Sequence, residues 1–247
     1  MNTNPSYTKP LQHFHQRIAE KTASNSARTV IIAALGDSVT AGLAGENEFL
    51  HGQVYHGQLK VLLEERYPQC VFSVINAGDS GQNAGGGFQL LERDVLHHQP
   101  DLLLIGFGLN DAHAGFDGLD TYTANLQAII DRAREATAAD LILLTPNMMP
   151  HHATNKIPER WRPDCGKFIS LQVDGVLAAY AERVREIGAK NNIPVADVYA
   201  AWEALEAAGR DTTAMLANGL NHPDARGHAI AADSLIAIVI NHETGES

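Results

Sequence analysis

Five apolar segments of strand length recur along the chain and constrain its fold more than any other feature. Residues 101–107 and 141–145 are apolar at nearly every position, as expected of parallel strands that are buried on both faces. Patterns typical of amphipathic helices lie between the segments. This alternation predicts right-handed βαβ crossovers and a mostly parallel sheet. The predicted strands cover residues 30–35, 71–76, 101–107, 141–145 and 193–197.

A three-layer α/β/α domain of the flavodoxin-like type accommodates this alternation, and we predict about five parallel strands in the order 2-1-3-4-5. The predicted helices cover residues 11–23, 56–67, 88–98, 121–136, 168–190, 199–208 and 225–239. Residues 1–28 are predicted to form a polar arm and a helix that packs on the domain. Residues 29–247 are predicted to form a single domain, because no glycine- or proline-rich linker divides them.

The charge balance disfavours several classes of partner. Lys and Arg number 18 against 29 Asp and Glu, a formal net charge of -11. This charge opposes non-specific attraction to nucleic acid or to an anionic membrane. No apolar run is long enough to span a bilayer, and residues 1–28 lack the apolar core of a signal peptide. We therefore predict a cytoplasmic protein that acts on a small molecule, with its oligomeric state left open.

Cofactor and metal motifs are absent from the sequence. Cys70 and Cys165 offer neither a disulfide framework nor the paired spacing of a structural zinc site. The adjacent histidines at 97–98 and 151–152 lack a third spaced ligand. The phosphate-binding loop, the H-E-x-x-H helix and the dinucleotide fingerprint do not occur. We predict no metal and no cofactor.

The first predicted strand ends in Gly36-Asp37-Ser38, where the chain must turn before small residues begin a helix. A serine in this place is a candidate nucleophile if a base lies within hydrogen-bond reach and backbone amides face the developing oxyanion. Asp and Ser are equally favoured in loops and at helix N-caps. Residues 36–40 also lack the second glycine of the G-x-S-x-G elbow, which argues against an ordinary α/β-hydrolase. The motif by itself leaves both interpretations open.

Three further stretches occur where a site at the strand ends requires them. They are Asn-Ala-Gly-Asp-Ser-Gly at 76–81, Gly-Leu-Asn-Asp at 108–111 and Asn-His-Pro at 221–223. Together with Gly36-Asp37-Ser38 they resemble the GDSL-type esterases and lipases, also called the SGNH hydrolases. The resemblance runs from about residue 30 to about residue 235. It implies a hydrolase that needs no metal.

The resemblance also implies a role for each matching residue. Ser38 attacks the ester carbonyl, and His222 removes its proton and later protonates the leaving alcohol, with an acyl-enzyme between the two steps. The oxyanion hole consists of the backbone N–H groups of Ser38 and Gly81 and the side-chain amide of Asn110. Gly81 is expected to leave room for close approach of the substrate. Without the resemblance, Gly81 and Asn110 read equally well as turn residues, and His222 is one of 12 histidines.

The match departs from the family pattern at the acidic partner of the histidine. That residue normally stands three positions before the histidine, where this chain has Gly219. Three explanations stay open: a Ser38–His222 dyad oriented by a backbone carbonyl, an acid from elsewhere such as Asp211 or Asp224, or an impaired enzyme. The first block also reads Gly-Asp-Ser-Val where the family has Gly-Asp-Ser-Leu.

We predict a serine-dependent carboxylic-ester hydrolase that acts on short-chain acyl esters or sugar O-acetyl esters. Two alternatives use the same residues: a catalytically impaired, SGNH-like binding protein for small molecules, and a thioesterase. The proline-rich connection at 146–166 is predicted to form a lid over the site. Asp37 and Asp111 are interpreted as structural carboxylates.

Overall fold

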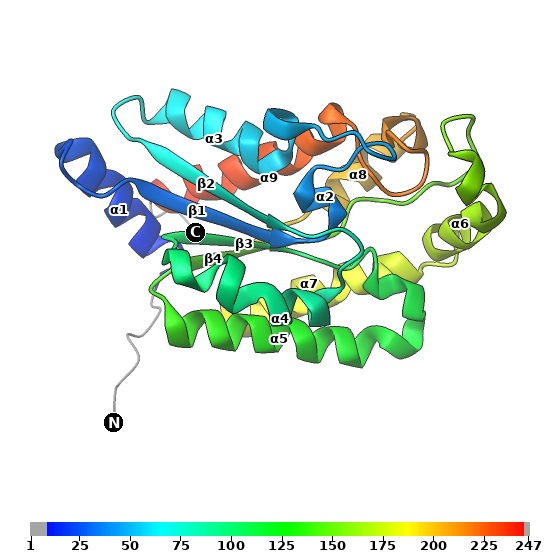
Figure 1. Cartoon of the computed structure of the whole chain (residues 1–247), viewed down its shortest axis with the longest axis horizontal. Helices are drawn as coiled ribbons and strands as arrows, with labels where there is room; N and C mark the ends of the chain where they lie inside the picture. The colour runs from blue at the N-terminus through cyan, green and yellow to red at the C-terminus, as the bar shows by residue number, and fades with distance from the viewer. Residues whose placement is uncertain (1–8, 245–247) are drawn as a thin grey trace.

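A parallel sheet of five strands forms the centre of the molecule (Figure 1) in the computed structural model, which describes residues 9–244. Its strand order is β2-β1-β3-β4-β5, and every neighbouring pair is parallel. The strands are β1 (Val30–Gly36), β2 (Phe72–Gly78), β3 (Leu102–Gly106), β4 (Asp140–Leu144) and β5 (Val195–Ala196). The predicted fold class and strand order are confirmed.

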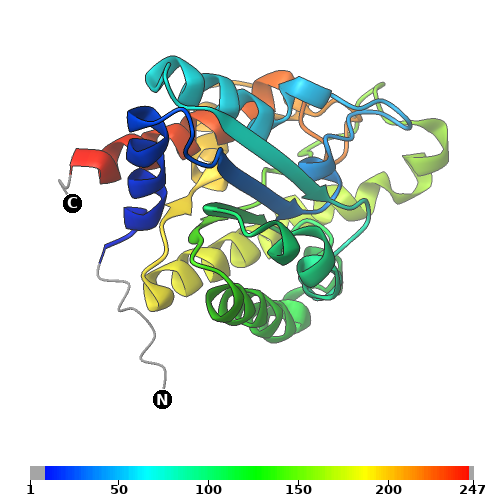
Figure 2. The same cartoon turned by 60° about the vertical axis from the view of Figure 1, so that its left-hand side comes forward.

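Helices cover both faces of the sheet (Figures 1 and 2). One layer holds α3 (Tyr55–Arg66), α8 (Val198–Ala207) and α9 (Ala225–Thr244). The other layer holds α4 (Ala84–Asp94), α5 (Leu119–Ala136) and α7 (Val176–Asn191). Because both faces are covered, the side chains of β1 and β3 are buried almost without exception, which explains their nearly continuous apolar sequence.

Helix α1 (Gln12–Ala23) crosses the amino ends of the strands, beside the last turns of α9 (Figure 2). It buries Phe14 and Ile18 in the core. The backbone N–H of Phe14 donates to Asp140 Oδ2 at 2.8 Å, and the Arg17 guanidinium donates to Asp101 Oδ1 at 3.2 Å. This helix therefore closes the end of the sheet opposite to the carboxyl ends of the strands.

The single helix predicted over residues 168–190 is wrong. The structure has two helices there, α6 (Cys165–Val173) and α7, which meet at Gly175. Gly175 has a φ of +77°, a left-handed conformation that glycine adopts at little cost. The apolar periodicity continues across the break, so periodicity alone predicts one continuous helix. Among residues 9–244, no helix is both long enough and apolar enough to cross a membrane.

Candidate active site

Ser38 is the first residue of the short helix α2 (Ser38–Ala41), directly beyond the carboxyl end of β1. The carboxylate of Asp37 accepts a hydrogen bond from the Val39 N–H at 2.9 Å and so caps the helix. A Cβ on Gly36 would lie 2.1 Å from Thr40 Oγ1, so the turn requires glycine there. These local contacts place the Ser38 side chain, which is 5% exposed, at the end of a buried strand.

His222 faces Ser38 from a loop that lies 184 residues later in the chain. Its Nε2 atom lies 2.9 Å from Ser38 Oγ. The carbonyl of His222 accepts a 2.7 Å hydrogen bond from the Ala217 N–H, which fixes the loop before α9. Burial lowers the pKa of His222 to about 4, against a smaller opposing contribution from a backbone hydrogen bond with Ala44. The imidazole is therefore neutral at physiological pH.

One cleft of about 420 Å³ brings together all four residues that the sequence singled out, Ser38, Gly81, Asn110 and His222. Gly81 has a φ of +80°, and a Cβ there would meet no atom within 4 Å. Backbone conformation, not crowding by the protein, accounts for this glycine. The Asn110 side chain donates one N–H to the Gln82 carbonyl at 2.8 Å, which orients its amide and leaves the second N–H available.

The model of the GDSL-like lipase/acylhydrolase family matches residues 34–230, a range that contains all four of these residues. The chain belongs to this family. Ester hydrolysis is therefore its class of activity, and the predicted family resemblance is confirmed.

Several relatives of this acylhydrolase are known. The acetylxylan esterase of Geobacillus stearothermophilus is 27% identical in an alignment of 217 positions, and the match covers 82% of this chain and 90% of the relative. The crystal structure of a lipase/acylhydrolase from Enterococcus faecalis matches with a TM-score of 0.64 at 24% identity, covering 85% of this chain and 95% of that one. A two-domain esterase active on acetylated mannans, co-crystallized with mannopentaose, matches with a TM-score of 0.69 at 18% identity, covering 96% of this chain and 55% of that one.

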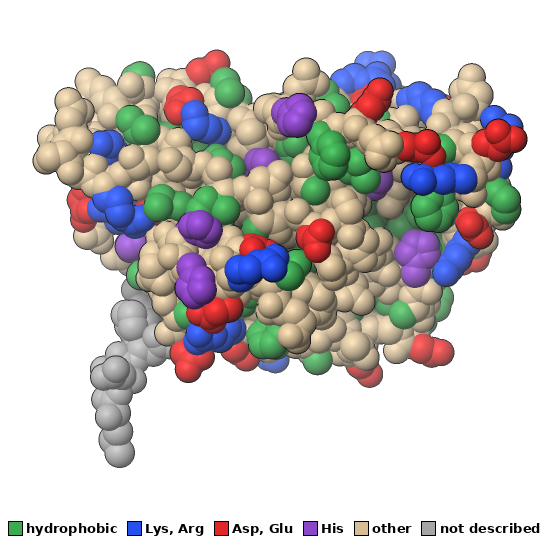
Figure 3. All heavy atoms as spheres, in the orientation of Figure 1, with side chains coloured by type: hydrophobic (Ala, Val, Ile, Leu, Met, Phe, Trp, Pro, Cys, Tyr) green, Lys and Arg blue, Asp and Glu red, His purple; other side chains and the backbone are tan. Residues whose placement is uncertain are grey.

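The outer wall of the acylhydrolase cleft comes from the proline-rich connection and from α6. Pro158, Arg160 and Trp161 line the cleft from this side, and Trp161 is 41% exposed. Arg160 Nε lies 2.7 Å from Glu46 Oε1, so this wall is joined to the loop that follows α2. On the face seen in Figure 3, acidic and basic side chains lie side by side at the end of the molecule where α6 lies.

The first half of the same connection has a different role from the predicted lid. Met148, Met149 and Ile157 are buried in the hydrophobic core. The cleft-facing part of the connection begins at Pro158. Any lid function is therefore confined to the short helical segment Glu159–Asp164 and its immediate neighbours.

The structure provides no acidic partner for His222 at any of the positions that the sequence suggested. Gly219 has a φ of +69°, and a Cβ there would lie 2.6 Å from Thr154 Oγ1, so this position has no room for an aspartate. Asp211 Oδ2 lies 3.7 Å from His152 Nε2, and Asp224 forms an ion pair with Arg226 at 2.6 Å.

The side chain that contacts the far nitrogen of His222 is the amide of Asn218. Its Nδ2 atom lies 3.1 Å from His222 Nδ1. The sequence reasoning missed this residue because it looked for an acid three positions before the histidine. The available signal was an amide four positions before it, next to a glycine.

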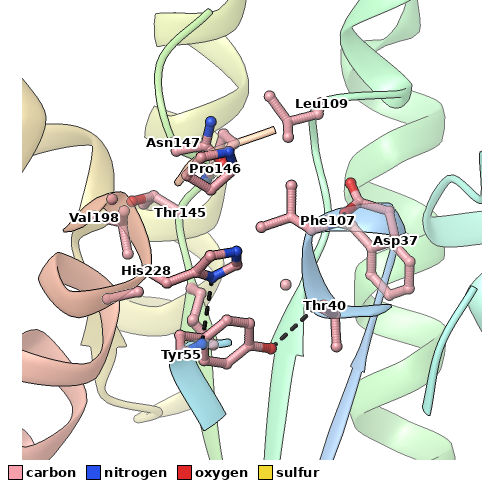
Figure 4. A pocket seen from close by; sticks show the side chains of 16 residues that line it. Asp37, Thr40, Tyr55, Phe107, Leu109, Thr145, Pro146, Asn147, Val198 and His228 are labelled. Atoms are coloured by element: carbon pink, nitrogen blue, oxygen red, sulfur yellow. Dashed lines mark hydrogen bonds between the residues drawn. The ribbon is translucent and has the colours of Figure 1, made fainter. Parts of the chain in front are cut away.

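A second cavity, of about 40 Å³, borders the same helix α2 (Figure 4). His228 lies in its wall, and its Nδ1 accepts a hydrogen bond from the Tyr55 N–H at 3.3 Å. The Tyr55 hydroxyl lies 3.1 Å from Thr40 Oγ1. Burial lowers the pKa of His228 to about 3. This histidine therefore packs as a neutral side chain behind helix α2.

Asp111 has a structural contact. Its carboxylate accepts hydrogen bonds from the Ala84 N–H at 3.0 and 3.3 Å and so ties the loop after β3 to the start of α4. Burial raises the pKa of Asp111 to about 6, although these backbone hydrogen bonds oppose the rise. Within the described residues, no group of three His, Cys, Asp or Glu side chains is placed to hold a metal ion.

Proposed function

We propose that this family member hydrolyses carboxylic esters through an acyl-enzyme on Ser38. The hydroxyl of Ser38 attacks the ester carbonyl while His222 takes its proton, and the resulting tetrahedral intermediate collapses as His222 protonates the leaving alcohol. Water then repeats the sequence and releases the acid. The observation that carries this proposal is the 2.9 Å contact between His222 Nε2 and Ser38 Oγ at the wall of the cleft.

The oxyanion hole of the proposed mechanism uses three donors: the N–H groups of Ser38 and Gly81 and the side-chain amide of Asn110. All three residues line the cleft. Within the described residues, the Gly81 N–H donates to no other group. The contact with Gln82 holds the Asn110 amide in place before the substrate arrives. Such preorganised donors stabilise the negative charge that develops on the carbonyl oxygen.

The proposed substrates are O-acetyl esters of sugars. The half-exposed indole of Trp161 offers a flat apolar face on which a sugar ring can stack, beside polar and charged side chains that suit hydroxyl groups. The relative from Geobacillus stearothermophilus is an acetylxylan esterase, and another structural match is active on acetylated mannans. A long acyl chain would need an extended apolar channel, whereas charged residues interrupt this cleft: Glu46, Arg160, Asp164 and Lys167.

Catalytic mutants of the acetylxylan esterase replace a serine, a histidine or an aspartate by alanine. The serine and the histidine agree with the roles proposed for Ser38 and His222. The aspartate stands three positions before that histidine, and this chain has Gly219 in the same place. The proposal therefore assigns a nucleophile and a base but no carboxylate as the third member of a triad.

Hydrolysis of 4-nitrophenyl acetate and of acetylated xylo-oligosaccharides by the wild type, Ser38→Ala and His222→Ala tests the proposal. We expect each substitution to lower kcat by about 10³-fold or more, as for the nucleophile and base of other serine hydrolases. A fluorophosphonate probe should label Ser38 in the wild type, as located by mass spectrometry. Full activity in Ser38→Ala, with correct folding by circular dichroism, would contradict the mechanism. Comparison with an acetyl thioester separates an esterase from a thioesterase.

A further inference from the structure

The imidazole of His222 is held between two side chains. Its Nε2 atom contacts Ser38 Oγ at 2.9 Å, and its Nδ1 atom contacts Asn218 Nδ2 at 3.1 Å. Asn218 is only 9% exposed, so water does not compete freely for this contact. In a serine hydrolase with a complete triad, a carboxylate occupies the position that this amide has here.

The orientation of the Asn218 amide follows from its other hydrogen bonds. Its Oδ1 atom accepts from the backbone N–H groups of Leu220, Asn221 and His222, each at 3.0 Å. Rotating the amide by 180° would place its NH₂ group against three N–H donors and leave all four groups unsatisfied. The amide nitrogen therefore faces the imidazole.

This orientation determines which ring nitrogen of His222 carries the proton. An amide nitrogen only donates, so Nδ1 of the imidazole must accept, and the proton of the neutral ring then resides on Nε2. A base for Ser38 needs the opposite tautomer, with Nε2 free to take the hydroxyl proton. When the triad aspartate of a serine protease is replaced by asparagine, the geometry survives but kcat falls by about 10⁴-fold, because the histidine adopts this wrong tautomer.

The surroundings of His222 also make it a weak base. Burial lowers its pKa to about 4, and a protonated ring would turn an N–H at Nδ1 toward the donor of Asn218. Within the described residues, no carboxylate contacts the ring to offset this. The other titratable groups of the cleft, and the histidine packed behind it, are Glu46, His113, Arg160, Asp164, Lys167 and His228.

We propose that Asn218 is a positioning residue that holds His222 in the tautomer protonated on Nε2, so that the enzyme hydrolyses esters at an attenuated rate. A carboxylate at position 218 reverses this, because it accepts the Nδ1 proton and frees Nε2. The inference rests on the mechanism of the proposed function, since the tautomer matters only if His222 is the base for Ser38.

The loop is already built to accept an aspartate at position 218. The three backbone N–H groups that donate to Asn218 Oδ1 would donate equally well to a carboxylate oxygen. The Asn218 NH₂ also donates to Asn221 Oδ1 at 3.0 Å. Rotation of the Asn221 amide would turn its own NH₂ toward the new carboxylate and restore that hydrogen bond.

The test compares the wild type with Asn218→Asp and with Asn221→Asp, using 4-nitrophenyl acetate. We expect Asn218→Asp to raise kcat at pH 7 by at least about tenfold, a part of the about 10⁴-fold effect of the reverse exchange. Asn221→Asp places the same charge in the cleft without contact to the imidazole, and we expect no gain from it. The acidic limb of the kcat/KM profile should move up from near pH 4 by about 1–3 units in Asn218→Asp, because a carboxylate stabilises the imidazolium.

The tautomer of His222 can also be measured in the wild type, so this test does not depend on whether Asn218→Asp folds. In wild-type protein with ¹⁵N-labelled histidine, NMR distinguishes the ring nitrogen that bears the proton, and a spectrum of His222→Gln assigns the signal. We expect the proton on Nε2. A proton on Nδ1 in the wild type would overturn the inference.

The kinetic outcomes separate the two proposals. If Ser38 of the wild type reacts with a fluorophosphonate and Asn218→Asp gains nothing, or gains no more than Asn221→Asp, the role of Asn218 is wrong while the mechanism stands. If neither the wild type nor Asn218→Asp is labelled at Ser38, the proposed mechanism itself fails.

Discussion

Buried carboxylates occupy both ends of the sheet, but their surroundings are opposite. At the amino end, Asp101 accepts hydrogen bonds from the Arg17 guanidinium at 3.2 Å and from the Ile31 N–H at 2.8 Å, and it also pairs with Arg28. At the carboxyl end, Asp37 accepts from the Val39 N–H at 2.9 Å and has no ion-pair partner within the described residues. Among the residues that the structure describes, Asp101 is thus stabilised by cations as well as a backbone amide, whereas Asp37 has backbone amides alone.

The pKa values follow this difference. Burial by itself would raise the pKa of Asp101, but hydrogen bonds and charges from His13, Ile31, Arg28 and Arg17 outweigh it, so the pKa is lowered. Burial dominates at Asp37 and raises its pKa to about 7. The hydrogen bonds and ion pairs of Asp101 thus stabilise the fold at the amino end. At the carboxyl end, the described part of the chain buries the Asp37 carboxylate without a cation beside Ser38, the proposed nucleophile, as is common where a fold presents reactive groups.

Removing a donor at the carboxyl end should affect catalysis more than stability. We expect Asn110→Ala to lower kcat for 4-nitrophenyl acetate by about 10²–10³-fold, the usual effect of losing one oxyanion donor. Its thermal unfolding should change little, because the side chain is only partly buried and makes one hydrogen bond to Gln82. A loss below twofold in kcat would exclude Asn110 from the oxyanion hole.

The amino end should show the reverse pattern. We expect Asp101→Asn to lower the free energy of unfolding at pH 7 by about 3 kcal/mol, because Arg17 and Arg28 lose a buried partner. The folded pKa is depressed, so this contribution is present above the unfolded pKa of about 4 and is lost as pH falls through the folded pKa. Urea denaturation at pH 7 and pH 3 measures both effects. Esterase kcat should stay within twofold of the wild type.

Asp37 should give the opposite dependence on pH. Its folded pKa of about 7 exceeds the ordinary value of 3.8, so the wild type loses stability as pH rises from about 4 through about 7. Asp37→Asn keeps an acceptor for Val39 and has no charge to bury. Its melting temperature relative to the wild type should therefore rise between pH 5 and pH 8, by an amount equivalent to about 2 kcal/mol. A difference in melting temperature that stays constant from pH 5 to pH 8 would refute the raised pKa of Asp37.

The smallest effect is expected at the rim of the cleft. Trp161→Ala should raise KM for acetylated xylo-oligosaccharides by about fivefold, equivalent to about 1 kcal/mol of aromatic contact. The change for 4-nitrophenyl acetate should be smaller, because that substrate carries no sugar ring. Equal changes for both substrates would argue against Trp161 as a sugar platform and against sugar esters as substrates.

The sequence pattern correctly predicted those features of the fold that depend on burial. Strands that are covered on both faces are apolar nearly throughout, as β1 and β3 are, which marks them in the sequence. The helices between the strands then predicted their parallel direction, and the flavodoxin-like type predicted their order. Ser38, Gly81 and Asn110 could be placed in one crevice because the carboxyl ends of parallel strands meet at one edge of the sheet, whereas His222 was placed there by the family resemblance. The break at Gly175 was missed because both helices present apolar residues at the same spacing, and only the left-handed backbone separates them.

The sequence by itself determined the sheet and the residues that meet at its carboxyl edge, because both depend on residue types repeated or placed along the chain. Only the tertiary structure decided what orients His222. Gly219 leaves no room for an acid, and the loop folds back so that three backbone N–H groups capture one side of the Asn218 amide and direct its other side to the imidazole. The direction of that amide depends on backbone N–H groups. Every residue except proline has one, so the sequence does not indicate which of them will donate to Asn218.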